Sequence, residues 1–417
     1  MVLSRLKFRN IFILTFFTAL VFLILYFEAL IPSWRGHLEI DTWNFYLQIK
    51  YFISQHTFAG YKNNEVLPPT LLFLLIPGFL AGWQPFDYGH YLQAFFVVIF
   101  VVLALQLWLI NLQKATLLRQ LMFLITLVLF GPIILFRFDG LVAFLVILSL
   151  WLWQKNKYGF SGLSLGYAAA MKVYPIIFLP YLFFLLLNQK QYFKIVMFSF
   201  CFGLGVFLPI IIYFLLGGTL PQIIEGLEFH SLKYVSIESV PGTILTGLSL
   251  WLNKRPLPLI GGYGIWGIRS PIVDAIGLEW FNRLWIFPIT LFYLYLLRQK
   301  EFFKKLSWGI IYFLVLLFLI FSKNLHAQYA WWFMSLFPLL KPKKKFLTDY
   351  LIMFGLLCLI ALLNQDIYPR LYTDFLDQFY KYGREVEIFY LQVLRNFLIL
   401  ALAVVSFKYL FIKKTVR

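Results

Sequence analysis

Long apolar runs separated by short polar segments dominate the chain from one end to the other. Runs of about 15–24 apolar residues are typical of helices that cross a bilayer. We expect spans near 11–31, 91–112, 121–136, 139–154, 159–172, 174–188, 195–215, 283–298, 307–322, 328–340, 347–363 and 388–411. The pattern therefore predicts an all-α polytopic membrane protein with about twelve transmembrane helices, formed by residues 1–417 as a single domain.

Composition supports lipid as the solvent for this chain. Of the 417 residues, 62% are hydrophobic and 13% are charged, whereas soluble domains carry about 25% charged residues. The two cysteines, Cys201 and Cys358, lie inside apolar runs and indicate neither a disulfide framework nor a metal site. The basic start of the chain leads into a run too long for a signal-peptide core, so we expect a retained first span.

The charged residues are sorted by sign along the chain. The net charge is +18, and the basic residues gather in seven short clusters between apolar runs. These clusters are Arg5/Lys7/Arg9, Lys114/Arg119, Lys155/Lys157, Lys190/Lys194, Arg298/Lys300/Lys304/Lys305, Lys341/Lys343/Lys344/Lys345 and Lys413/Lys414/Arg417. Most acidic residues lie in the segments between them. Because cytoplasmic loops are enriched in Lys and Arg, this placement predicts both termini in the cytoplasm and argues against nucleic-acid binding.

One apolar segment, Pro68–Trp83, does not fit this count of spans. It is short and broken by prolines, and a full crossing would place Lys114 and Arg119 outside. We expect a membrane-dipping segment in a large first outer loop, 32–90, although a true span with the parity repaired elsewhere is the alternative. A second long outer loop is predicted over 217–282, and a shorter final outer segment without a recognisable motif is predicted over 364–387.

Several ionisable residues near the outer membrane face need an explanation, because such charges are costly and tend to be paired or functional. Arg137 and Asp139 are separated by one residue between two apolar runs, and either close a helical hairpin as an ion pair or line a substrate site. Lys172 follows the small-residue stretch 162–171, and small residues let a helix pack closely against a neighbour. Its ammonium either snorkels to the interface or binds an anion, and Lys172 and the nearby Tyr174 are candidate substrate-binding residues.

Asp41 follows the first span and precedes aromatic residues. By itself this position favours a helix N-cap, and the alternative is a general base at the membrane surface. Two further polar clusters occur in the outer segments, one with His230, Lys233 and Glu238 and one with Lys323 and Gln328. Nucleotide-binding and metal-ligand motifs are missing from the sequence. An outward cavity with cations and acid–base groups fits either an enzyme for lipid-linked phosphates or a transporter of organic anions.

These same clusters resemble the GT-C integral-membrane glycosyltransferases, in particular glycosyltransferase family 87. The likeness covers roughly residues 37–335. It rests on five elements: an acid then aromatics and a Pro-Pro segment (41–46, 68–69), Arg-aromatic-Asp (137–139), a Gly-rich helix ending Lys-x-x-Pro (162–175), His-x-x-basic-x-x-x-Ile-Glu-Ser (230–239) and Ser-Lys-x-x-x-x-Gln-Tyr (322–329). Family members commonly have Arg where Lys233 stands and Pro where Ala327 stands.

The resemblance implies a sugar, with mannose favoured, carried by polyprenyl phosphate on the outer face of the plasma membrane. It implies that Asp41 is the catalytic base, that the sugar passes to a hydroxyl of a lipid or glycan acceptor, and that its anomeric configuration inverts. Lys172, Lys233 and either Lys323 or Arg137 would neutralise the departing phosphate, and His230 and Glu238 would orient the sugar or phosphate. No nucleotide is implied, and no visible cluster requires a metal ion, although some GT-C enzymes use one.

Two other functions remain open at this point. A flippase or transporter of lipid-linked glycans usually has paired halves with broken helices at corresponding positions, and we find no such halves. A glycan polymerase or ligase would also have a long basic outer loop. We expect Asp41, Lys172 and His230 to line one cavity if the transferase hypothesis is right.

Overall fold

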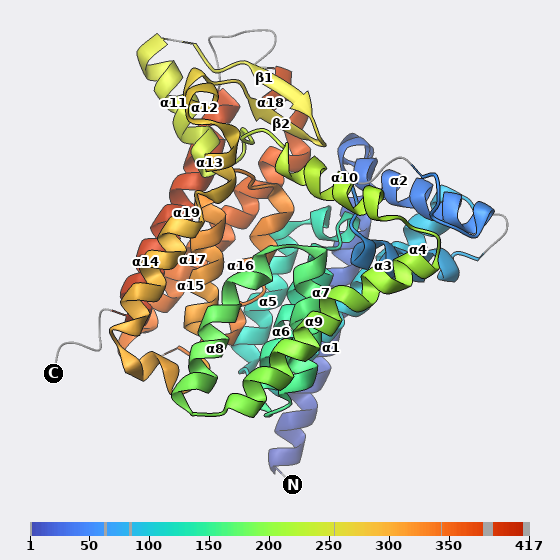
Figure 1. Ribbon diagram of the computed structural model, residues 1–417. Coiled ribbons are helices and arrows are strands. Elements are labelled where there is room, and N and C mark those ends of the chain that lie inside the picture. The colour runs from blue at the N-terminus through green and yellow to red at the C-terminus, as the bar shows by residue number, and fades with distance from the viewer. Residues whose placement is uncertain are drawn as a thin grey trace.

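Helices make up most of the protein and stand side by side as a bundle with a smaller layer across one end (Figure 1). The computed structural model describes residues 2–61, 65–82, 86–253, 255–342, 344–377 and 387–411. Trp83, the basic cluster Lys413/Lys414/Arg417, Lys343 and part of the predicted outer segment 364–387 lie outside these residues.

The helices of the first half are α1 (Val2–Ala29), α2 (Pro32–Gln55), α3 (Pro68–Leu80), α4 (Tyr88–Leu112), α5 (Leu117–Phe130), η1 (Pro132–Phe136), α6 (Asp139–Gln154), α7 (Tyr158–Met171), η2 (Tyr174–Phe178), α8 (Leu179–Asn188) and α9 (Tyr192–Leu215). Then come α10 (Leu220–Ser231), α11 (Val240–Asn253), α12 (Pro271–Ile276), α13 (Leu278–Arg283), α14 (Ile286–Leu297), η3 (Lys300–Phe303), α15 (Trp308–Phe321), η4 (Ala327–Ala330), α16 (Trp331–Met334), η5 (Phe337–Leu339), η6 (Lys344–Phe346), α17 (Leu347–Gln365), η7 (Asp366–Arg370), α18 (Tyr372–Asp377) and α19 (Glu387–Phe411).

The prediction of an α-helical membrane protein is confirmed. Within the described residues, six helices are long and apolar enough to cross a membrane, and five shorter apolar helices accompany them. The expected count of twelve crossings stays a prediction. Two of the expected spans are not continuous helices: 121–136 breaks at Gly131, whose φ is +74°, and 328–340 is built from η4, α16 and η5.

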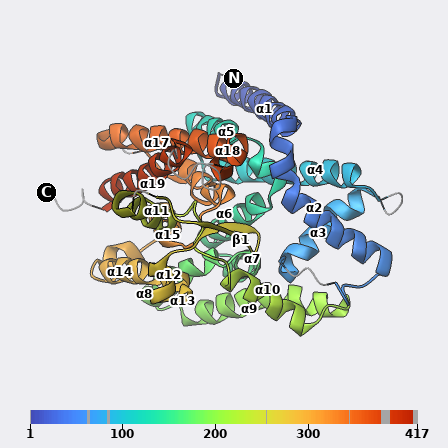
Figure 2. The ribbon, with the colours of Figure 1, turned by 90° about the horizontal axis from the view of Figure 1, so that it is seen from above.

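A two-stranded hairpin lies in the predicted long outer loop. Strands β1 (Leu259–Gly262) and β2 (Ile265–Ile268) pair antiparallel, with Leu259 opposite Ile268. Together with α10, α11, α12 and α18, the hairpin forms a layer over one end of the bundle (Figures 1 and 2). The prediction of an all-α chain missed this hairpin because its Gly-rich strands carry little periodic signal.

The predicted first outer loop is largely helical. Helix α2 begins at Pro32, a residue suited to the first helical turn because its fixed φ matches the helix. Asp41 therefore lies in the middle of α2, and the N-cap interpretation of Asp41 is wrong. Pro68 likewise begins α3, which is 13 residues long. Whether α3 dips into the membrane or crosses it stays a prediction.

The basic clusters among the described residues lie at the end of the bundle away from the hairpin layer. Asn188 donates to Phe303 O (3.2 Å), and Gln189 donates to Lys304 O (3.3 Å). Other contacts join further segments at this end. Lys194 Nζ lies 4.9 Å from the Tyr158 ring centre, at the start of α7. Arg119 donates to Leu340 O (3.4 Å), and Tyr409 donates to Lys341 O (2.9 Å). The α8–α9 connection and the N-terminus lie at this same end in Figure 1.

Glycines let α7 and α9 approach each other at backbone distance. A methyl group built on Gly162 would lie 2.3 Å from Phe198 O, and one on Gly166 would lie 2.1 Å from Phe202 O. On the other helix, a methyl group on Gly205 would lie 2.3 Å from Leu163 O. Small residues at such an interface maximise van der Waals contact where lipid supplies no hydrophobic driving force. This confirms the close packing expected of the small-residue stretch before Lys172.

We predict that Gly205→Ala lowers the melting temperature of the detergent-purified protein. The added methyl group collides with main-chain atoms that cannot move aside, at a cost of about 1–3 kcal/mol. The matched control is Gly203→Ala in the same helix, where no atom lies within 4 Å of the new methyl group. The control should melt at or above the wild-type temperature because alanine favours helix. Equal melting temperatures for the two variants would contradict the packing argument.

Candidate functional site

A pocket of about 360 Å³ lies where the hairpin layer meets the bundle. Its walls come from α2, the segment before α3, the start of α6, the end of α7, the chain after α10, the hairpin, η4 and the η7–α18 region. Of the predicted site residues, Asp41, Arg137, Asp139, Lys172, His230, Lys233, Glu238 and Gln328 line this pocket. The expectation that Asp41, Lys172 and His230 face one cavity agrees with this geometry.

Arg137 is the central cation of the pocket wall. Its Nε lies 2.9 Å from Asp41 Oδ2, and its Nη1 donates to Leu38 O and Phe136 O, each at 3.1 Å. Its Nη2 donates to the Tyr368 hydroxyl at 3.0 Å. Arg137 is 5% exposed, so these partners replace the water it has lost. The sequence left two alternatives for Arg137 and Asp139, an ion pair that closes a hairpin or a substrate site. The first is wrong, because among the described residues Arg137 pairs with Asp41 and not with Asp139.

Asp41 keeps one oxygen available to the pocket. Arg137 holds Oδ2, and within the described residues Oδ1 has no hydrogen-bond partner. The Asp41 side chain is 32% exposed, against 7% for Arg137. The carboxylate is thus fixed in position by a buried guanidinium while its second oxygen faces the cavity.

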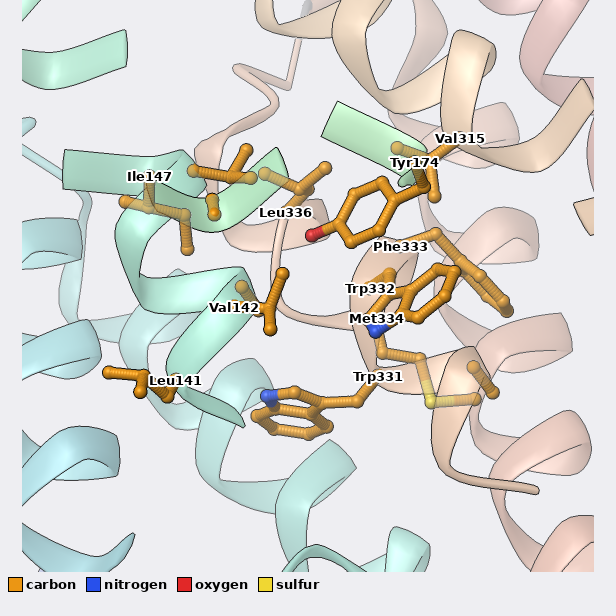
Figure 3. Packing of buried hydrophobic residues seen from close by; sticks show 14 of the residues in the cluster. Leu141, Val142, Ile147, Tyr174, Val315, Trp331, Trp332, Phe333, Met334 and Leu336 are labelled. Atoms are coloured by element: carbon orange, nitrogen blue, oxygen red, sulfur yellow. The ribbon is translucent and has the colours of Figure 1, made fainter. Parts of the chain in front are cut away.

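Asp139, the first residue of α6, is held by an aromatic stack below the pocket. Trp332 Nε1 donates to Asp139 Oδ1 at 2.9 Å. The Trp332 ring lies between two others, with Tyr174 at 4.1 Å and Tyr329 at 4.4 Å between ring centres. Figure 3 shows the Tyr174 and Trp332 rings packed against each other. Tyr174, predicted to bind substrate, lies outside the pocket lining and supports it from beneath.

Lys172 ends α7 and places its ammonium over aromatic faces. Its Nζ is 4.8 Å from the Phe138 ring centre and 5.1 Å from that of Tyr329. Among the residues described, no carboxylate lies within 4 Å of this ammonium and no acceptor is hydrogen-bonded to it. A cation that lines a pocket without a direct ion pair is suited to bind an anionic ligand group.

Lys233 is the second cation with a loose partner. Its Nζ lies 3.9 Å from Glu65 Oε1 and 5.1 Å from the Phe229 ring centre. Burial raises the pKa of the Glu65 carboxyl, with a further push from Asp41, and burial lowers the pKa of the Lys233 ammonium. Both pKa shifts favour the neutral forms of Glu65 and Lys233. The loss of hydration on burial outweighs the attraction between the two groups, because their charged atoms are 3.9 Å apart.

His230 and His326 line the pocket as neutral rings. His230 Nε2 donates to Glu65 O at 3.0 Å, so its Nδ1 is left as an acceptor. Burial, reinforced by Lys233 and Lys172, lowers the pKa of His230 to about 3. Burial and the same lysines lower the pKa of His326 well below its usual value. Neither ring therefore adds positive charge at neutral pH.

Lys323, one of the cations expected at the departing phosphate, has a different position. Its ammonium donates to Ser231 O at 2.8 Å and also to Lys233 O. Burial and the neighbouring Lys233 lower its pKa to about 8. Lys323 does not line the pocket and instead ties the end of α10 to the segment before η4.

Sequence reasoning missed Glu65, His37, His326, Tyr368 and Tyr372, all of which line the pocket. His326 lies inside the Ser-Lys-x-x-x-x-Gln-Tyr element, and Glu65 lies three residues before Pro68 of the Pro-Pro segment, so both had a positional signal. The two tyrosines lie in the final outer segment, which has no recognisable motif. In the described part of the chain, no three His, Cys, Asp or Glu side chains are grouped to hold a metal ion. Independence from a metal stays a prediction.

The comparisons with known proteins agree with the membrane architecture. Residues 66–288 match the family model described as glycosyltransferase family 87, and this chain belongs to that family. The protein is therefore a membrane glycosyltransferase, which decides against a transporter. The chain is also 26% identical, over 313 residues, to a protein called GPI mannosyltransferase 1 from Kluyveromyces lactis, covering 70% of this chain and 71% of the relative.

We predict that the His230 ring does not titrate between pH 5 and 8 in the folded protein. Its pKa near 3 reflects burial beside two ammonium groups, so the proton is lost far below this range. Side-chain NMR spectra of histidine-labelled protein would test this, with the His230 signal assigned by its loss in His230→Gln. A His230 signal that shifts with pH across this range would contradict the assigned environment.

Proposed function

We propose that this membrane glycosyltransferase transfers mannose from a polyprenyl-phosphate donor to a hydroxyl of a lipid or glycan acceptor, with inversion. The observation that carries the proposal is the pairing, in one pocket, of a positioned carboxylate, Asp41, with two loosely partnered ammonium groups, Lys172 and Lys233. The choice of mannose rests on the family resemblance and on the name of the yeast relative.

The reaction needs a base and a stabilised leaving group. The acceptor oxygen attacks the anomeric carbon, its proton passes to Asp41 Oδ1, and the bond from the anomeric carbon to the phosphate oxygen breaks. Attack opposite the departing phosphate inverts the configuration. Lys172 and Lys233 neutralise the charge that grows on the phosphate, which is the usual form of electrostatic catalysis.

The size and surroundings of the pocket support a sugar phosphate as ligand. Its volume of about 360 Å³ falls in the range of small-molecule sites. His230 and His326 are neutral, so they can hydrogen-bond sugar hydroxyls without competing with the lysines for phosphate. Arg137 is occupied by Asp41, Tyr368 and two carbonyls, and its role is to hold the base rather than the phosphate.

The distribution of charge supports an extracytoplasmic site. The pocket opens at the end of the bundle with the hairpin layer, and the described basic clusters lie at the other end. Because Lys and Arg mark the cytoplasmic side, the donor would be used on the outer face of the plasma membrane. The chain termini would then face the cytoplasm.

We predict that Asp41→Asn abolishes mannose transfer while the protein still folds. The amide can still accept a hydrogen bond from Arg137 but cannot take the acceptor proton, so kcat should fall about 10²–10⁴-fold. The assay incubates purified protein with a panel of polyprenyl-phosphate sugars and measures released polyprenyl phosphate. Glu65→Gln is the matched comparison, since Glu65 is another carboxylate that lines the pocket. An active Asp41→Asn with an inactive Glu65→Gln would move the role of base to Glu65.

We predict that the pocket end is accessible from outside the cell. In a background with Cys201 and Cys358 replaced by alanine, an Asp274→Cys variant on α12 should react with a membrane-impermeant thiol reagent in intact cells. A Lys157→Cys variant at the basic end should react only after permeabilisation. The reverse labelling pattern would place the site on the cytoplasmic side.

A further inference from the structure

The η7–α18 segment contributes a wall of the pocket that the family match does not include. Tyr368 of η7 and Tyr372 of α18 both line the cavity, and both lie beyond the matched residues 66–288. Their rings meet edge to face with centres 4.8 Å apart. This wall therefore belongs to the part of the chain for which no role has been assigned.

Tyr368 and Tyr372 form what we call the tyrosine wall. Hydrogen bonds attach this wall to α2 near the proposed base, Asp41. The Tyr368 hydroxyl donates to His37 O at 2.7 Å and accepts from Arg137 Nη2 at 3.0 Å. His37 Nε2 is hydrogen-bonded to Thr373 Oγ1 at 2.7 Å, and the His37 ring meets the Tyr372 ring edge to face at 5.5 Å. Arg137 also holds Asp41, the proposed base. A single side chain, Arg137, therefore connects the tyrosine wall to the carboxylate that takes the proton.

Glu238 completes this side of the pocket. Its main-chain carbonyl accepts hydrogen bonds from Arg395, Gln392 and Asn396, three buried side chains of α19. Its carboxyl is within hydrogen-bonding reach of the Tyr372 hydroxyl, and burial raises its pKa. Glu238 thus presents a carboxyl of fixed position beside an aromatic ring.

The two sides of the pocket differ in charge. Among the described lining residues, the cations are Arg137, Lys172 and Lys233. Lys172 and Lys233 act electrostatically on Glu65, His230 and His326, whereas the cations that act on Glu238 are Arg395 and then Arg137. Arg395 does not line the pocket, and it donates to Asn364 Oδ1, Asn396 Oδ1 and Glu238 O. The tyrosine side has no available cation, so it is unsuited to a phosphate and suited to a neutral, hydroxyl-rich ring.

We infer that His37, Tyr368, Tyr372 and Glu238 form the subsite for a neutral acceptor sugar, on the opposite side of Asp41 from the phosphate-binding lysines. This inference rests on the proposed function. The acceptor ring packs on Tyr372, hydrogen-bonds to the Glu238 carboxyl, and directs its nucleophilic hydroxyl toward Asp41. Aromatic faces combined with a carboxyl provide both apolar contact and hydrogen bonding for such a ring.

The test compares acceptor and donor kinetics in Tyr372→Ala and Tyr372→Phe. With octyl α-mannoside as acceptor probe and a polyprenyl-phosphate mannose donor, Tyr372→Ala should raise the KM for the acceptor about 10-fold and change the donor KM by less than about twofold. Tyr372→Phe, which keeps the ring and loses the hydroxyl, should show a smaller rise. The matched control is Tyr390→Ala, which removes an exposed tyrosine of α19 that lies outside the pocket.

Binding measured without turnover separates this inference from the proposed function. Saturation-transfer NMR should detect octyl α-mannoside on wild-type protein and on Tyr390→Ala, with a reduced signal on Tyr372→Ala of unchanged melting temperature. Equal acceptor KM values in Tyr372→Ala and wild type would overturn the subsite. A change confined to the donor KM would do the same, as would a loss of the NMR binding signal that accompanies a lower melting temperature. Failure of the proposed function is a different result, in which wild-type protein releases no polyprenyl phosphate from any donor in the panel.

Discussion

Burial of the Arg137 guanidinium is the constraint on which the pocket depends. A buried charge is stable only when it is paired and its donors are satisfied, and removing one partner costs several kcal/mol. Arg137 is paired with Asp41, and its Nη1 and Nη2 atoms donate hydrogen bonds to groups from three separate parts of the chain, the α2 helix, the η1 turn and the η7 segment. The same contacts that stabilise the cation therefore bring the proposed base and the tyrosine wall together.

This arrangement explains why the pocket has two electrostatic characters. Arg137 is paired with Asp41 and hydrogen-bonded to Leu38, Phe136 and Tyr368, while Lys172 and Lys233 retain loosely partnered ammonium groups. In the proposed arrangement, Asp41 separates these lysines from the wall that contains Tyr372 and Glu238, all of which line the pocket. A transferase of this kind needs such a division, because the leaving group is an anion and the nucleophile is a hydroxyl.

The packing below the pocket explains its rigidity. Trp332 is stacked between Tyr174 and Tyr329 and also donates to Asp139, so the start of α6, the turn η2 and the segment η4–α16 form one unit. The glycine contacts between α7 and α9 fix the end of α7 that carries Lys172. Positioned groups of this kind avoid reorganisation during the reaction, which is the main way in which a protein site stabilises developing charge.

The sequence alone determined the membrane-protein class, the sorting of charge between the two ends and most of the pocket residues, including Asp41, Lys172 and His230. These features are local, because apolar run length, charge placement and short motifs are properties of neighbouring residues. Tertiary structure decided which groups pair. It assigned Arg137 to Asp41 rather than to Asp139, placed Asp41 within a helix instead of at its cap, and directed Lys323 to main-chain carbonyls. It also brought Tyr368 and Tyr372 to the pocket from more than 300 residues beyond α2. Such contacts follow from the packing of whole helices, which no local pattern encodes.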